Sequence, residues 1–304
     1  MITPNLIHDP IHGTIEIPNF MSQILKEKSF RRMQFIRQLG LQAFIDFPNA
    51  IHTIYSHVLG VMHLANQVTN RLINLESTSG RKDIKEILEN NKNNLLAAAL
   101  LHDIGSGPFS HVIDFVLKEY CTTDHEKKSF ELFDKLDWIN SKGLDTDEIK
   151  KIITGNHDYK FLNNIITGPL DCDKLDYLLR DSYHVGLKYS FDLNHFIGNF
   201  RILVDESSKF ENYELGLEND IISIKTAEIF LIIWKNMYDL VYHIKESRIA
   251  EKAIIVKIEK EPDFINHLKD NEKYLELDGE KLLKILEEEN DISSNFGFCS
   301  ILRR

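Results

Sequence analysis

Apolar residues recur along this chain with a period close to that of an α-helix over most of its length. The pattern is clear in residues 54–72, where the apolar side chains fall on one face: Val58, Val61, Met62 and Ala65. The same period predicts helices at about 21–39, 54–72, 95–102, 125–136, 146–154, 172–183, 226–260 with a break near Lys245, and 263–289, and a further helix from about Phe109. The chain is therefore expected to be mainly α.

Two stretches have a β-type pattern instead. Residues 8–18 surround Gly13 with short alternating residues, which predicts a small strand or hairpin. Residues 200–224 contain the strings FRILVD, ENYELGLE and IISI around turn residues at 206–209, which predicts a β-hairpin or small sheet. Residues 76–94 are charge-rich with one weak helical pattern, so we interpret them as an exposed excursion between core helices. The last fifteen residues resemble a tail.

The stretch from 95 to 115, LLAAALLHDIGSGPFSHVIDF, places polar chemistry at the end of an apolar helix. His102 and Asp103 come at the end of the apolar run, and helix breakers follow them: Gly105, Gly107 and Pro108. An imidazole and a carboxylate at a buried helix end are costly unless a positive group satisfies them. A divalent metal is the obvious candidate.

Four residues make the best candidate metal set: His57, His102, Asp103 and Asp173. Nitrogen and carboxylate ligands without thiolate suit Mn, Fe, Mg, Co or Zn. The alternative for each histidine taken singly is a hydrogen-bonded core residue, which is more common than a metal ligand.

The helix that follows Asp171 has two distinct faces. Leucines occupy one face, and the other carries polar groups: Asp173, Lys174, Tyr177 and Asp181. The polar face is either a solvated salt-bridge stripe or the lining of a pocket. The Gly-Pro turn before the helix and the tyrosine among the charges favour the pocket.

Composition narrows the class of protein further. The chain has 304 residues, 43% of them hydrophobic, and a formal charge of -11, which argues against an extended nucleic-acid footprint. We find neither a signal-peptide pattern nor an apolar run of membrane-spanning length, so a cytoplasmic location is expected. The three cysteines are far apart, and we expect them to be reduced and to serve only in packing: Cys121, Cys172 and Cys299.

Several strings, in this order, resemble the HD-domain phosphohydrolases, in particular the branch of the deoxynucleoside triphosphate triphosphohydrolases. The strings are DPIHGTIEI, YSHVLGVMHLA, LLHDIGSGPFSHVID, GPLDCDKLDYLLRDSYHVG and, more weakly, MYDLVYHIKESR. The resemblance covers about 5–190, with a weaker patch at 226–250. It implies an HD-domain helical bundle with a small β insertion, a divalent metal cofactor, a nucleotide substrate and a homo-oligomer. In that family the products are a deoxynucleoside and inorganic triphosphate.

The resemblance also implies roles for individual residues. The four candidates His57, His102, Asp103 and Asp173 would hold the metal. His111 would lie near the attacked phosphate, and His125, with Asp114 close by, would donate a proton to the leaving oxygen. The substrate would be contacted by Gln38, Leu39, Lys174, Tyr177, Asp181 and Tyr242, and Lys245 matches a later family motif. Residues 1–200 are then the catalytic core, and 201–304 complete the pocket or form an oligomer interface.

Three positions depart from the family pattern, and each loses a cationic or proton-carrying group. Ser106 stands where a histidine is common, and Ile54 and Trp234 stand where arginines are common. Arginine binds phosphate bidentately, which neither replacement can do. Two alternatives therefore stay open beside a triphosphate substrate: hydrolysis of another nucleotide (monophosphate, cyclic or modified), or a sensor or partner protein that binds nucleotide without turning it over.

Overall fold

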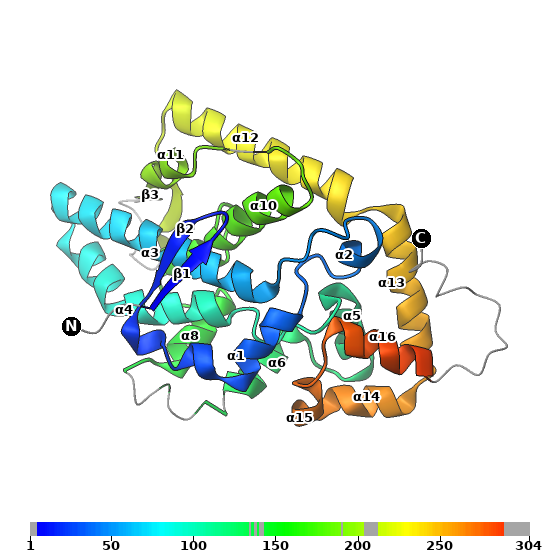
Figure 1. The fold of residues 1–304 in the computed structure, drawn as a ribbon. Coiled ribbons are helices and arrows are strands. Elements are labelled where there is room, and N and C mark those ends of the chain that lie inside the picture. Colours follow the sequence, from blue (N-terminus) through cyan, green and yellow to red (C-terminus); the bar gives the residue numbers. More distant parts are fainter. Residues whose placement is uncertain are drawn as a thin grey trace.

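The computed structural model describes residues 5–133, 135, 136, 139, 143–189, 191–203 and 212–288. It confirms a mainly helical protein with two small antiparallel sheets (Figure 1). Strands β1 (Asn5–Asp9) and β2 (Gly13–Ile17) form the predicted N-terminal hairpin, and Gly13 turns it with a φ of 72°. The buried side chains of β2 fix this hairpin against helix α3 (Ile54–Ser79).

The single helix predicted at 21–39 is wrong. The segment forms four short pieces instead: η1 (Asn19–Met21), η2 (Ile24–Lys26), α1 (Lys28–Arg31) and η3 (Arg32–Phe35). Glu27 has an extended conformation and interrupts the helical period. The apolar side chains that set this period, Phe30, Met33 and Ile36, are nevertheless buried, because successive short turns bring them to the core in the way that one helix would.

Residues 76–94, predicted to be an exposed excursion, belong to the central helical hairpin. Helix α3 ends at Ser79, Gly80 caps it in the left-handed conformation, and α4 (Lys82–Leu101) returns antiparallel to it (Figure 1). Ile84 and Leu88 lie one helical turn apart and are both buried. Two apolar residues at this spacing suffice to pack a charged helix, so the charge-rich composition was misleading.

The helices after α4 surround its C-terminal end. They are α5 (Ser110–Tyr120), α6 (His125–Phe133), α8 (Thr146–Ile153), α9 (Lys160–Ile166) and α10 (Cys172–His184). Asp171 caps α10 by accepting a hydrogen bond from the Lys174 backbone amide, as predicted. Helix α10 packs against α3, which brings residues far apart in the sequence together.

The second sheet lies between α11 (Leu193–Gly198) and α12 (Ile221–Met237). Its strands, β3 (Phe200–Leu203) and β4 (Glu214–Leu217), confirm the predicted hairpin, whereas the predicted turn at 206–209 lies outside the described residues. The prediction of a strand at IISI is wrong, because Asp220 accepts hydrogen bonds from the amides of Ile222 and Ser223 and so starts α12. Capping determines this segment despite its β-branched residues.

The C-terminal part continues α12 through a π-helix, η5 (Tyr238–Tyr242), and then breaks before Lys245 as predicted. It contains α13 (Lys245–Ile258), α14 (Pro262–Lys269), α15 (Asn271–Tyr274) and α16 (Gly279–Glu288). The predicted tail and Cys299 lie outside the described residues.

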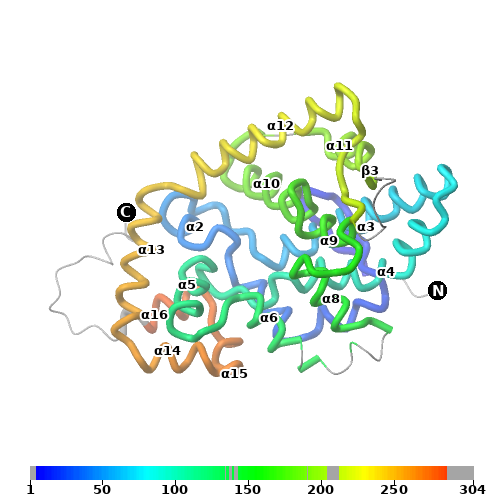
Figure 2. The backbone as a smooth tube through the Cα atoms, turned by 180° about the vertical axis from the view of Figure 1, so that it is seen from behind, coloured from blue at the N-terminus to red at the C-terminus, as the bar shows by residue number. Residues whose placement is uncertain are grey.

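Two hydrophobic clusters hold the fold together. One extends from β2 to η5, and the other joins α5 to the C-terminal helices, which surround α5 in Figure 2. Helix α12 also exposes several isoleucines, which fits the expected homo-oligomer; that expectation and the boundary near residue 200 stay predictions. None of the helices in the described part of the chain is long and apolar enough to span a membrane.

Candidate functional site

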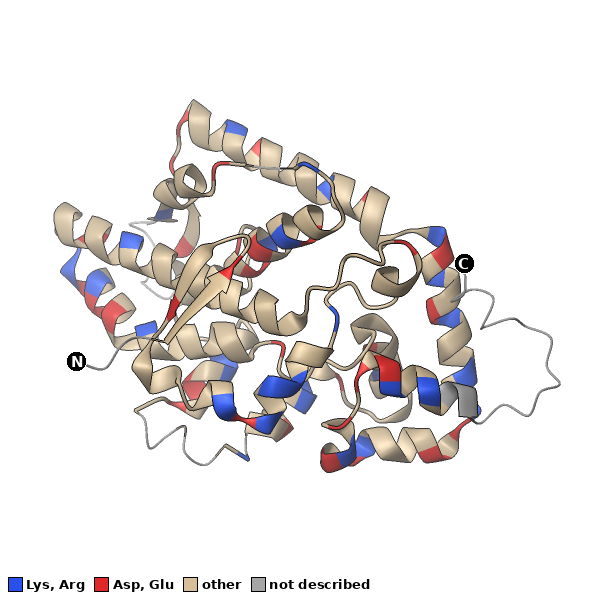
Figure 3. Cartoon of the chain, in the orientation of Figure 1, with Lys and Arg blue, Asp and Glu red and all other residues tan. Residues whose placement is uncertain are grey.

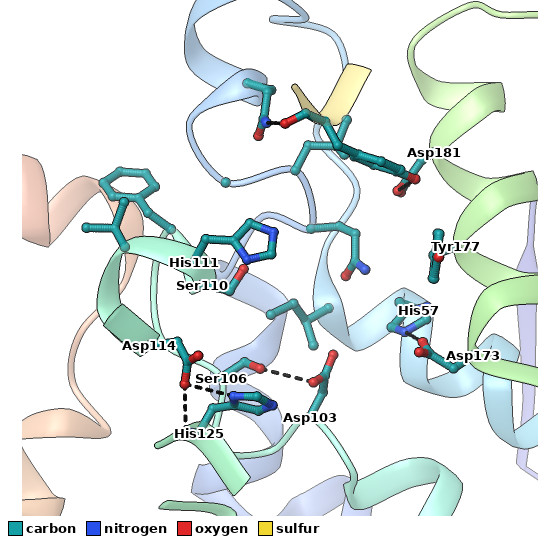
Figure 4. A pocket seen from close by; sticks show the side chains of 18 of the residues that line it. His57, Asp103, Ser106, Ser110, His111, Asp114, His125, Asp173, Tyr177 and Asp181 are labelled. Carbon is teal, nitrogen blue, oxygen red and sulfur yellow. Dashed lines mark hydrogen bonds and ion pairs between the residues drawn. The ribbon is translucent and has the colours of Figure 1, made fainter. Parts of the chain in front are cut away.

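Helices α3 and α10 and the end of α4 bring the four predicted metal ligands together. The Nε2 atom of His57 lies 2.9 Å from Oδ1 of Asp173, and Nε2 of His102 lies 3.7 Å from the same oxygen. One ligand atom from each of His57, His102 and Asp103 lies within 4.8 Å of the others. Figure 4 shows His57, Asp103 and Asp173 directed toward the same part of the cavity. Three helix ends thus supply one ligand set.

This set fits a divalent metal. The Nε2 atom of His102 is buried and has no hydrogen-bond partner among the described residues, while its Nδ1 contacts the Ala99 carbonyl oxygen at 2.9 Å. An imidazole whose Nδ1 donates in this way presents a bare nitrogen at Nε2, as metal-bound histidines do. Two imidazole nitrogens and two carboxylates are donors that suit hard and borderline ions.

The protonation of His57 shows how strongly the set favours positive charge. Burial alone lowers the pKa of His57, but the carboxylates of Asp173 and Asp176 more than offset it and raise this pKa to about 10. Burial likewise opposes ionisation of Asp173, yet its contacts with His102 and His57 hold its pKa below the usual range. A metal ion would take the place of the proton, since histidine ligates in its neutral form.

Behind the ligands lies a buried charge network that the sequence analysis did not identify. The carboxylate of Asp176 contacts His12 Nε2 at 2.6 Å, His57 Nδ1 at 2.8 Å and Arg180 Nε at 2.8 Å. Arg180 also donates to Asp9 at 2.7 Å, and the side chains of Asp176 and Arg180 are fully buried. Asp176 therefore fixes the ring of His57 so that Nε2 faces Asp173.

The predicted proton donor and its partner lie across the loop from the ligands. His125 Nδ1 is 2.9 Å from Oδ1 of Asp114, and the His125 backbone amide donates to the same oxygen at 3.0 Å. The hydrogen bond to Asp114 raises the pKa of His125. Burial works against ionisation of Asp114, but the contacts with His125 and Lys118 keep its pKa low. The pair therefore favours the protonated form of His125.

One cavity of about 640 Å³ contains every predicted site residue. These lining residues are Gln38, Leu39, His57, His102, Asp103, His111, Asp114, His125, Asp173, Lys174, Tyr177, Asp181 and Tyr242. The polar face of α10 therefore lines a pocket, which favours the pocket interpretation over a solvated stripe. Lys245 does not line this cavity. The individual roles of the lining residues stay predictions.

Asp181 is held at the cavity wall from two sides. The Tyr242 hydroxyl donates to its Oδ2 at 2.7 Å, and His52 Nε2 lies 2.7 Å from its Oδ1. Tyr238 and Tyr177 flank Tyr242 with ring centroids 5.1 and 6.1 Å away, which forms an aromatic wall. His52 and Tyr238 were not identified from the sequence. Such a wall suits a planar aromatic ligand group.

The three departures from the family pattern have definite surroundings. Ser106 donates its hydroxyl to Asp103 Oδ1 at 3.1 Å and so steadies a candidate ligand (Figure 4). Ile54 is buried and lines the cavity. Trp234 packs on Tyr238, with ring centroids 4.4 Å apart, and against the larger hydrophobic cluster. Ile54 and Trp234 therefore place apolar side chains where the family commonly has arginine.

Comparisons with known proteins agree with this geometry. An HD-domain profile matches residues 54–181. The chain is 31% identical over 226 residues to the deoxynucleoside triphosphate triphosphohydrolase SAMHD1 homolog of Dictyostelium discoideum, covering 69% of this chain and 42% of that protein. It is 30% identical over 257 residues to an uncharacterized protein of Methanocaldococcus jannaschii, covering 84% and 49%. The chain thus spans about half or less of the length of these curated relatives.

A solved structure supports the fold over nearly the whole chain. A hypothetical protein from Aquifex aeolicus superimposes with a TM-score of 0.77 at 25% identity, covering 99% of this chain and 75% of that one.

A further sequence relative is the human deoxynucleoside triphosphate triphosphohydrolase SAMHD1. It is 30% identical over 237 residues, which cover 66% of this chain and 36% of that protein.

Proposed function

Because residues 54–181 form an HD domain and the chain is a distant relative of the SAMHD1 triphosphohydrolases, we propose that it is a metal-dependent phosphohydrolase acting on a nucleotide. The observation that carries the proposal is the convergence of His57, His102, Asp103 and Asp173 in one cavity. Deoxynucleoside triphosphate is the first candidate substrate, since the names of these relatives state it.

The residues of the cavity can perform the chemistry of hydrolysis. A divalent ion held by the four ligands would lower the pKa of a coordinated water and neutralise charge on the phosphate oxygens. For a deoxynucleoside triphosphate, water attacks the α-phosphorus, the bond to O5′ breaks, and deoxynucleoside and triphosphate leave. His125 donates the proton that O5′ takes up, and Asp114 keeps that imidazole oriented. Lys174 and His111 donate to phosphate oxygens.

The test measures metal content and hydrolysis together. Purified protein is analysed for bound metal and then given deoxynucleoside mono-, di- and triphosphates with Mn, Mg, Fe or Co, with products separated by chromatography. The proposal expects hydrolysis of at least one nucleotide, and this hydrolysis should stop when a chelator removes the metal. Tight nucleotide binding without turnover under any metal would overturn the proposal and favour a sensor or partner protein.

A second candidate is hydrolysis of a nucleotide with fewer phosphates, including cyclic or modified ones. The observation that favours it is the apolar side chain at Ile54 and at Trp234, where cations for a triphosphate tail are common in the family.

Replacing His125 by alanine is expected to slow turnover by about 10²- to 10⁴-fold, the usual contribution of a positioned proton donor. Metal content should stay near that of the native protein, because His125 lies across the loop from the ligands and bonds to Asp114. Metal analysis beside steady-state kinetics checks this prediction. Loss of metal in His125→Ala would contradict the role of proton donor.

Replacing Asp114 by asparagine is expected to move the alkaline limb of the pH–rate profile to lower pH. His125 must be protonated to donate, so activity is present below its pKa and is lost as the pH rises through it. Asp114 raises that pKa, and the neutral amide raises it less. The profile of kcat/KM between about pH 5 and 9 shows the shift. An unchanged alkaline limb would mean that His125 is not the titrating group.

A further inference from the structure

The cavity has an unusual balance of charge for a site that binds polyphosphate. Among the described residues, seven carboxylates line it: Asp103, Asp114, Glu126, Asp171, Asp173, Asp181 and Glu251. Only two lysine or arginine side chains in that part of the chain do so: Lys174 and Arg248. Figure 3 shows lysine and arginine concentrated on outer helices such as α1 and α13. A bound divalent ion would offset two of the carboxylates, and the lining would remain acidic.

Both lining cations already have acidic partners. Lys174 Nζ lies 2.6 Å from Oδ2 of Asp171 and donates to the Gly168 carbonyl oxygen at 2.8 Å. Arg248 Nη1 lies 2.8 Å from Oε2 of Glu251. A triphosphate tail would therefore compete with these carboxylates for each cation and would also face their negative charge.

The remaining polar groups of the lining serve other tasks or carry no permanent charge. Of the five lining histidines, His57 and His102 belong to the metal set and His125 is bound to Asp114. The two left, His111 and His243, can donate hydrogen bonds to phosphate oxygens. The lining therefore offers hydrogen-bond donors for one phosphate group, but it lacks the free positive charge that three phosphate groups would need.

We infer that the site takes a nucleotide bearing a single phosphate ester group, and that the nucleoside part supplies most of the binding. This inference rests on the proposed function of a metal-dependent phosphohydrolase, and it selects the second candidate substrate named there over a triphosphate. Water adds to the only phosphorus, the bond to O5′ breaks, and O5′ takes a proton, so a nucleoside and orthophosphate are released. The aromatic wall of Tyr177, Tyr238 and Tyr242 provides a surface for the base. Asp181, held by Tyr242, provides an acceptor for a sugar hydroxyl.

The size of the cavity agrees with this ligand. Its 640 Å³ lies in the range of about 300–1,000 Å³ that is usual for small-molecule sites, so a whole nucleotide fits. Phosphates beyond the first would add at least about one negative charge each near the carboxylates of the lining. Those carboxylates therefore discriminate against longer tails by repulsion, which is a common way to obtain specificity.

The experiment compares one nucleoside with three tail lengths. Deoxyadenosine mono-, di- and triphosphate are given separately to the metal-loaded protein, and kcat/KM is measured for each. We expect the monophosphate to exceed the triphosphate by at least about tenfold, a modest difference for two extra charges in a partly buried site. A triphosphate that is hydrolysed as well as the monophosphate would overturn the inference and leave the proposed function standing. No hydrolysis of any of the three would count against the proposed function itself.

A charge variant tests the stated cause. Glu251→Gln removes one lining carboxylate and releases Arg248, so the preference for monophosphate over triphosphate should narrow several-fold. Glu246→Gln, on the exposed first turn of the same helix, is the matched control and should leave the preference unchanged. An unchanged preference in Glu251→Gln would show that the lining charge does not set the tail length.

Discussion

Replacement of Asp103 by alanine is expected to empty the metal site and to reduce hydrolysis by more than about 100-fold. Outer partners of metal ligands already cost about 10- to 100-fold when removed, and a direct ligand costs more. Asp103 lies beside another candidate ligand, since His102 Nε2 is 3.8 Å from its Oδ2, and the Ser106 hydroxyl donates to its Oδ1. Folding should persist, because Asp103 lies in a loop and is partly exposed.

Metal analysis, circular dichroism and kinetics on Asp103→Ala separate loss of metal from loss of fold. Asp83→Ala is the matched control, since Asp83 is an exposed carboxylate in the first turn of α4, far along the helix from the site. The control should retain metal and activity. Full metal content in Asp103→Ala would remove this residue from the ligand set.

The second large effect is expected at Asp176, which supports the site from behind. Asp176→Ala should lower the free energy of unfolding by about 3–5 kcal/mol, the usual cost of removing one partner from a buried ion pair. The change leaves Arg180 with Asp9 as its remaining anionic partner and removes acceptors for His12 and His57, all in a buried environment. Urea denaturation measures the difference.

Asp176→Asn distinguishes support of the metal site from bulk stability. Asparagine keeps the shape of the side chain and an oxygen that His57 can bond to, so the fold should be retained. Metal affinity should fall by at most about 100-fold. Titration of the apoprotein with Mn²⁺ gives that affinity. Native stability in Asp176→Ala would show that Arg180 is satisfied without this carboxylate.

The shape of this network also restricts Gly60. A Cβ atom at Gly60 would lie 1.8 Å from Oδ1 of Asp176 and 2.6 Å from Arg180 Nη2. Only glycine lets the ion pair approach the α3 backbone so closely, which explains a glycine in the middle of a well-formed helix.

The sequence indicated the candidate site residues better than it indicated how distant segments of the chain pack together. Helical periodicity and the string around His102 and Asp103 pointed to candidate metal ligands, and their side chains lie together in the structure. The reason is local: a helix end followed by glycines has few possible conformations. The polar face of α10 could also be predicted from the sequence, because residues three and four positions apart share a face of a helix.

What the sequence could not give depends on long-range packing. Asp9 and His12 meet Asp176 and Arg180 across more than 160 positions, and no local pattern encodes such a pairing. A signal was present in the DPIHG string near the start and in the i, i+4 spacing of Asp176 and Arg180. The helix prediction for 21–39 failed for a related reason, since its apolar period fits several short turns, of which η3 packs on α3, as well as one helix.

The position of a bound metal ion is the most direct test of the proposed site. Crystals of the protein grown with Mn²⁺ would be measured at the manganese absorption edge, and the anomalous difference map calculated. We expect a peak bounded by the side chains of His57, His102, Asp103 and Asp173. A strong peak elsewhere, with these four side chains joined only to one another, would contradict it.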